Sequence, residues 1–185
     1  MAEIRGATFT HKLFHTRSFA WLWAVVRVWL GWQWLTAGWG KLFNPAWMET
    51  GAALRGYFTN ALGGTAINYD WYRAFLNFLL EGGHYTWFAK LVVIGEVLVG
   101  LGLILGAFTG IAAFFGAFMN MAFMLAGTTS SNPVLFTVAI LIMAAWKVAG
   151  WYGLDRWLLA EVGTPWQPGR TIARWLGRDT EAEAH

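Results

Sequence analysis

The segment KLVVIGEVLVGLGLILG, residues 90–106, is an almost unbroken apolar run with a single carboxylate, Glu96, near its middle. A helix that crosses the hydrocarbon core of a bilayer needs about 20 predominantly apolar residues. Four stretches of the chain approach this length and composition, at residues 18–42, 86–106, 109–127 and 133–152. Only 12% of the 185 residues are charged and 57% are hydrophobic, which is too apolar for a soluble domain of this size. The sequence therefore predicts an all-α fold, a polytopic membrane four-helix bundle.

The distribution of basic residues predicts how this bundle lies in the membrane. Lys and Arg precede the first predicted span and follow the fourth, whereas the long segment 44–85 holds only two arginines, balanced by acidic residues. Because Lys and Arg are enriched in cytoplasmic loops, we expect both termini in the cytoplasm. Residues 1–160 then form the transmembrane domain, and residues 161–185 form a cytoplasmic tail.

The segment 44–85 is predicted to lie outside the membrane as an external lid. NPAWMETGAALRGYF and NYDWYRAFLNFLLEGG are each too short and too mixed to cross a bilayer, but both have aromatic or leucine faces. Such faces are typical of short helices that lie in the membrane interface. The basic side chains at this end are candidates to bind an anion: Lys41, Arg55, Arg73 and His84.

Composition also restricts the chemistry that the chain can carry. It contains no cysteine, which excludes a disulfide framework, thiolate ligation of an iron–sulfur cluster and covalent attachment of c-type haem. Its four histidines lie in the tails or at the edge of a span, so we expect no metal site and no covalently bound cofactor. The net charge of +3 is modest and its basic residues flank the spans, which gives no indication of nucleic-acid binding.

Polar residues inside the predicted spans form the candidate site. Counting about 1.5 Å per residue from the cytoplasmic end of each span places Arg27, Glu96 and Asn120 at one level, and Lys147 approaches the same layer. A charge at the bilayer centre costs about 2.5–3.5 kcal/mol. We therefore expect Arg27 and Glu96 to point inward and neutralise each other, with Asn120 completing a midplane polar node.

Two alternatives to a functional node remain open. A buried ion pair can serve only to fix which helices pack together, although charges within a membrane are functional hypotheses by default. Lys147 can instead extend its long side chain to the cytoplasmic interface, where the ammonium group stays hydrated.

Several motifs carry a family resemblance when they are taken together. In chain order they are RVWLGWQWLTAGWGKLFNP, GEVLVGLGLILG, GAFMNMAFMLAG, SNP and AGWYGLDRWL, within about residues 17–160. They contain, at similar order and spacing, Arg27, Gly38, Lys41, Glu96, Asn120, Asn132, Pro133 and Asp155. This pattern resembles the DoxX-like family of bacterial and archaeal membrane proteins, which includes the DoxD-type membrane subunit of thiosulfate:quinone oxidoreductase.

The resemblance implies a function and a location. A chain of this family is expected in the plasma (inner) membrane of a bacterium or archaeon, as a subunit of a quinone-reducing oxidoreductase for a sulfur compound such as thiosulfate. The polar node would then hold the quinone, the lid cations would attract the sulfur oxyanion, and a DoxA-type subunit would be the partner. An oligomer is compatible with the sequence. The alternative is a non-catalytic scaffold or accessory subunit of a respiratory or oxidative-stress complex.

Overall fold

The computed structural model describes residues 8–164 and 167–175, and these residues are almost entirely helical. They contain eleven α-helices, one short 3-10 helix at Arg17–Phe19 and a single pair of two-residue strands. The predicted all-α class is therefore confirmed.

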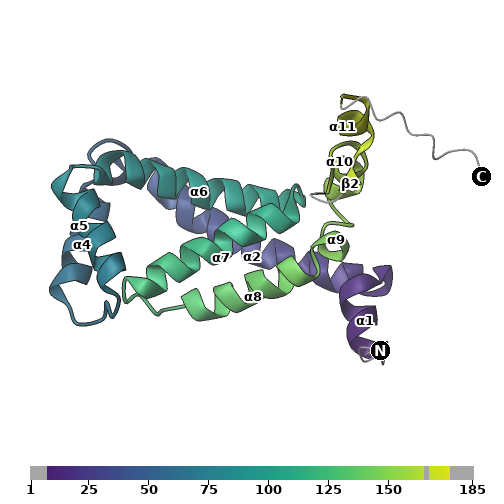
Figure 1. Cartoon of the computed structure of the whole chain (residues 1–185), viewed down its shortest axis with the longest axis horizontal. Helices are drawn as coiled ribbons and strands as arrows, with labels where there is room; N and C mark the ends of the chain where they lie inside the picture. Colours follow the sequence, from purple (N-terminus) through teal and green to yellow (C-terminus); the bar gives the residue numbers. More distant parts are fainter. Residues whose placement is uncertain (1–7, 165–166, 176–185) are drawn as a thin grey trace, which may run out of the picture.

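The body of the molecule consists of long helices that run roughly along one axis (Figure 1). They are α2 (Ala20–Leu42), α6 (Tyr85–Leu105), α7 (Thr109–Leu125) and α8 (Asn132–Ala144). Helix α2 packs against α6, and α7 packs against α8 and α6. Figure 1 shows the two ends of this bundle, which we call the lid end, with α4 and α5, and the termini end, with α1 (Thr8–His15) and the last helices.

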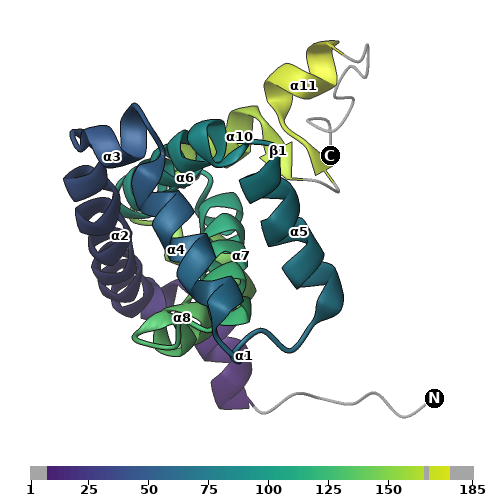
Figure 2. The same cartoon turned by 90° about the vertical axis from the view of Figure 1, so that its left-hand side faces the viewer.

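Three short helices form the lid, as the sequence predicts for residues 44–85. They are α3 (Pro45–Met48), α4 (Ala52–Gly63) and α5 (Asp70–Glu81), and Figure 2 shows α4 and α5 lying across the end of the bundle. The Asn44 side chain accepts the N–H of Ala46 at 2.9 Å and so starts α3. Buried side chains of α4 and α5, among them Phe58 and Leu76, pack with Ala89 of α6 in a core of their own. The position of this lid outside the membrane stays a prediction.

At the termini end the chain continues through several short elements. They are α9 (Trp146–Ala149), α10 (Asp155–Glu161), β1 (Gly163–Thr164), β2 (Gln167–Pro168) and α11 (Arg170–Trp175). The strands pair antiparallel, and α11 contacts α10. The predicted cytoplasmic tail starts within this region, and residues 176–185 lie outside the described residues.

The number of membrane spans is not confirmed. In the described part of the chain, α6 is the one helix long and apolar enough to cross a membrane, while α7 and α8 are shorter apolar helices. The fourth predicted span, 133–152, is not one helix, because the chain turns at Ala145 between α8 and α9. The 13 residues of α8 reach about 20 Å, less than the roughly 30 Å of a hydrocarbon core.

The outward faces of the bundle support a membrane location. Large apolar side chains on α6 and α7 are exposed in this chain, including Leu91, Leu98, Ile111, Phe115 and Phe118. Soluble monomers rarely expose contiguous apolar surface of this extent. Contact with lipid would remove this surface from water.

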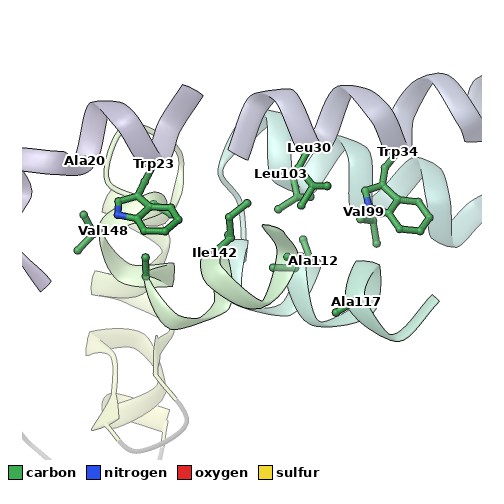
Figure 3. Close-up of a cluster of buried hydrophobic side chains, with 14 residues drawn as sticks. Ala20, Trp23, Leu30, Trp34, Val99, Leu103, Ala112, Ala117, Ile142 and Val148 are labelled. Atoms are coloured by element: carbon green, nitrogen blue, oxygen red, sulfur yellow. The ribbon is translucent and has the colours of Figure 1, made fainter. Parts of the chain in front are cut away.

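Small residues allow α2 and α6 to pack closely. A Cβ placed on Gly100 would lie 2.6 Å from the backbone nitrogen of Leu35, and one placed on Gly31 would lie 2.9 Å from the carbonyl oxygen of Gly100. Glycine is therefore required on both sides of this contact. The adjoining core contains Leu30, Leu103 and other side chains from several helices (Figure 3).

Candidate functional site

Glu96 forms a buried ion pair with Lys41, the last charged residue of α2. The ammonium nitrogen of Lys41 lies 2.5 Å from Glu96 Oε1, and the Glu96 side chain is only 1% exposed. The Lys41 side chain is 27% exposed, and its ammonium lies 4.9 Å from the centre of the Trp47 ring in α3. The pair therefore joins the interior of the bundle to the lid.

The predicted pairing of Arg27 with Glu96 is wrong. Arg27 donates hydrogen bonds to the carbonyl oxygens of Leu103, Ile104 and Tyr152, at the termini end. Glu96 faces α2 at Gly38, where an added Cβ would lie 3.0 Å from Glu96 Cβ. Gly38 follows Arg27 by eleven residues on α2, which is a rise of about 16 Å.

Arg27 and Glu96 lie at different levels because α2 and α6 do not end at the same level. Helix α6 stops at Gly106, whose backbone is left-handed at φ +65°, and a Cβ there would lie 2.6 Å from Arg27 Nη1. Helix α2 starts at Ala20 and so extends about two turns beyond this level. That extension packs against α9, where Figure 3 shows Trp23 beside Val148.

Buried polar atoms without partners occur in the Lys41–Glu96 pair itself and on α2 and α7. Among the described residues, buried atoms without a hydrogen-bond partner include Trp34 Nε1, Glu96 Oε2, Asn120 Nδ2 and Asn120 Oδ1. Trp34 lies beside Val99 (Figure 3), and a Cβ on Gly116 of α7 would lie 3.1 Å from Trp34 Nε1 and 3.2 Å from Val99 Cγ1. Glu96 and Asn120 are each about one turn from this contact, both toward the lid end. We call Trp34, Lys41, Glu96 and Asn120 the Glu96 cluster.

The Glu96 cluster has the chemistry of a polar binding site. It presents two kinds of unpaired donor, an indole N–H and an amide NH₂, and two unpaired acceptors, a carboxylate oxygen and an amide oxygen. Each buried polar atom without a partner costs about 1–3 kcal/mol. Water or a ligand with both donors and acceptors would remove that cost.

Lys147 does not join the Glu96 cluster. It is exposed on α9 at the termini end, and its ammonium lies 5.5 Å from the centre of the Trp146 ring. This position fits the alternative in which the ammonium stays at a hydrated interface.

The predicted anion-binding residues have different environments. Lys41 is held by Glu96, and Arg73 donates to the carbonyl oxygens of Leu62 at 3.1 Å and Ile67 at 3.2 Å, which fastens the connection between α4 and α5. The Arg55 guanidinium lies 5.8 Å from the centre of the Tyr85 ring, and His84 directly precedes that tyrosine. A shared anion site stays a prediction.

An aromatic cavity, which we call the lid pocket, lies between α4 and α5 of the lid and helices α6 and α7. Its volume is 330 Å³, and it is lined by rings from the lid and the bundle, among them Phe58, Trp71, Tyr72, Phe75, Phe88 and Phe118. The Tyr72 hydroxyl donates to the carbonyl oxygen of Ala122 at 2.7 Å. Burial raises the pKa of Tyr72 to about 12 and also raises the pKa of Tyr57, so both hydroxyls stay protonated at neutral pH.

Sequence reasoning missed Trp34 and the two tyrosines of the lid pocket. Trp34 shares a helical stripe of α2 with Gly31, Gly38 and Lys41. That stripe was the available signal. The tyrosines gave no comparable pattern, because their pocket forms only when the lid folds onto the bundle.

These features define a class of protein: a helical bundle with apolar outer faces, a buried lysine–glutamate pair and an aromatic pocket beneath a helical lid. Residues 22–168 match the family model described as "TQO small subunit DoxD". The chain belongs to the DoxD family, and the resemblance seen in the sequence is confirmed. Searches of curated proteins and of solved structures found no match.

The Lys41–Glu96 pair can be tested by a double-mutant cycle. Lys41→Met should lower the free energy of unfolding by about 2 kcal/mol, because it leaves a buried carboxylate without its counter-ion and Lys41 is partly exposed. Adding Glu96→Gln should recover much of this loss. Unfolding of the purified protein in detergent measures the stability of Lys41→Met, of Glu96→Gln and of the double variant. Additive effects would show that the two side chains are not coupled.

Proposed function

We propose that this protein is the quinone-reducing membrane subunit of a thiosulfate:quinone oxidoreductase. Membership of the DoxD family supports the reaction, since the family description names a TQO small subunit. A subunit also implies a protein partner, and the DoxA type is the candidate. Helix α6 and the exposed apolar faces of the bundle support a place in the plasma membrane. The distribution of Lys and Arg favours an orientation with the termini end at the cytoplasmic side.

The structural observation that carries this proposal is the lid pocket. Its volume of 330 Å³ is at the lower end of the range of about 300–1,000 Å³ for small-molecule sites. Aromatic side chains suit a planar quinone ring, because rings attract one another in offset and edge-to-face contacts. Phe118 and Trp71 line the pocket and are also exposed on the surface, so an isoprenoid tail can leave toward lipid.

Hydrogen-bonding groups occur in the lining of this pocket and next to it in the sequence. Tyr57 lines it and shares a hydrogen bond of 2.7 Å with Thr128, in which either hydroxyl can be the donor. Met119 lines the pocket, and the next residue, Asn120, belongs to the Glu96 cluster. Reducing a quinone to a quinol adds two electrons and two protons. We propose that Tyr57 orients the quinone and that the Glu96 cluster supplies protons, while thiosulfate supplies the electrons through the partner subunit.

The test is thiosulfate-dependent quinone reduction in membranes that contain the protein with its co-purifying partners. Phe75→Ala should raise the KM for quinone about fivefold, because an aromatic pair contributes about 1 kcal/mol beyond its burial. Phe78→Ala is the matched control, since Phe78 lies on the same helix but contacts His84 at 4.7 Å between ring centres and does not line the lid pocket.

The same assay separates binding from proton supply. Asn120→Leu should lower kcat with little change in KM, and it should leave folding stability nearly unchanged because the amide it removes is unpaired. An unchanged KM in Phe75→Ala would place the quinone elsewhere. If thiosulfate drives no quinone reduction with all co-purifying partners present, the scaffold alternative is favoured.

A further inference from the structure

A second cavity lies at the termini end, at the opposite end of the bundle from the lid. Its volume is 300 Å³, and three segments meet there: the end of α1 with the following 3-10 turn, the region of α9, and α10. Its lining includes four basic side chains, His15, Arg17, Lys147 and Arg156. We call this cavity the basic pocket.

The lining of the basic pocket carries more positive than negative charge within the described residues. Arg17, Lys147 and Arg156 are exposed, and the ion pairs of the described part of the chain involve other residues. Asp155 is the one carboxylate among the described lining residues, and both of its oxygens are occupied by the backbone N–H groups of Phe108 and Thr109. The pocket therefore attracts an anion from outside the chain.

Trp151 holds two of these cations in place. The Arg17 guanidinium carbon lies 3.7 Å from the centre of the Trp151 ring, and that of Arg156 lies 5.3 Å away. Stacking on an indole restrains a guanidinium group while its N–H donors remain available at the edge. Two restrained guanidinium groups beside a lysine match the several oxygens of a phosphate.

An apolar groove adjoins the basic pocket. The groove has a volume of 750 Å³ and shares Leu159 and Thr164 with the basic pocket. Its other lining residues include Phe114, Phe115, Met143 and Trp146, on helices whose outer faces are apolar. A free phosphate ion would use only the basic pocket, whereas a molecule with a phosphate and a hydrocarbon chain would fill both cavities.

We infer that the termini end binds an anionic phospholipid. Its phosphate lies between Arg17, Lys147 and Arg156, and an acyl chain lies in the adjoining groove. Basic pockets at the cytoplasmic side of membrane helices are suited to such head groups. This site is separate from the lid pocket and does not depend on the proposed reaction.

The experiment compares lipids added to the purified full-length protein in detergent. Phosphatidylglycerol should raise the melting temperature, while zwitterionic phosphatidylcholine and inorganic phosphate at matched concentrations should not. Native mass spectrometry gives the number of bound lipids and the apparent Kd. The double variant Arg17→Gln with Arg156→Gln should bind phosphatidylglycerol at least about tenfold more weakly than the wild type, because it removes two charge-assisted contacts.

A matched control variant has the same net charge as this double variant. Lys12→Gln with Arg174→Gln removes two exposed cations at the same end that do not line the basic pocket, so its affinity for phosphatidylglycerol should equal that of the wild type. Lys147→Gln serves as a second test variant if the double variant does not fold. Equal weakening in the test and control variants would overturn the inference. So would an equal shift with inorganic phosphate, which would indicate a site for free anions.

Discussion

Gly100→Val is expected to separate α2 from α6 and to lower the free energy of unfolding by more than about 4 kcal/mol. A Cβ at this position would lie 2.6 Å from the backbone nitrogen of Leu35 and 2.7 Å from its Cα. These are backbone atoms inside a helix, so they cannot move aside without moving α2. Separating the helices would also remove the contact at Gly38 that brings α2 against Glu96.

Gly40→Val is the control for this prediction. Gly40 lies on α2, and nothing in the described residues comes within 4 Å of a Cβ placed there. Its replacement should change stability by less than about 1 kcal/mol, since the new side chain meets open space and valine is a slightly better helix former than glycine. Thermal unfolding in detergent and protease susceptibility measure both variants. Similar stabilities for the two would show that the helices are not packed through Gly100.

Asp155→Ala is expected to lower the free energy of unfolding by about 4 kcal/mol. The Asp155 carboxylate accepts the N–H of Phe108 at 2.6 Å and of Thr109 at 2.8 Å, at the first turn of α7. Phe108 has a left-handed backbone at φ 50°, which a non-glycine residue adopts only when its surroundings hold it there. Removing the carboxylate leaves two N–H groups unpaired and releases the turn between α6 and α7.

The consequences of Asp155→Ala should extend to Arg27. The backbone N–H of Asp155 donates to the carbonyl oxygen of Gly106 at 2.7 Å. Gly106 lies on the turn that Arg27 also contacts. Hydrogen exchange should therefore rise at residues 103–109 in the variant. Asp70→Ala is the control, because Asp70 is exposed in the first turn of α5 and should contribute only a few tenths of a kcal/mol through the helix dipole. Equal losses from the two substitutions would contradict the role of Asp155.

Much of the fold was predictable because its signals are local. Long apolar runs and short amphipathic segments predicted the positions of α2, α6 and α7 and of the lid helices. Gly31 and Gly38 share one stripe of α2, and small residues on one stripe are typical of close contact between membrane helices. The family resemblance rested on several motifs spread over most of the chain, which a single helix could not have provided.

The partners of the buried charges were not predictable in the same way. Lys41 pairs with Glu96 across 55 positions of sequence, and Arg27 reaches carbonyl groups more than 70 positions away. Which residues meet depends on how far α2 is shifted along α6. That shift is set by the contact of Gly31 and Leu35 with Gly100 and by the end of α6 at Gly106.

The sequence by itself determined the helical class, the family, and the presence of buried polar residues that need partners. Only the tertiary structure decided that Glu96 pairs with Lys41, and that Arg27 belongs to the turn near Asp155. The physical reason is that helix formation depends on side chains three or four residues apart. Ion pairing across helices depends instead on their relative position along the axis, and a rise of about 16 Å along α2 separates Arg27 from Gly38, which faces Glu96.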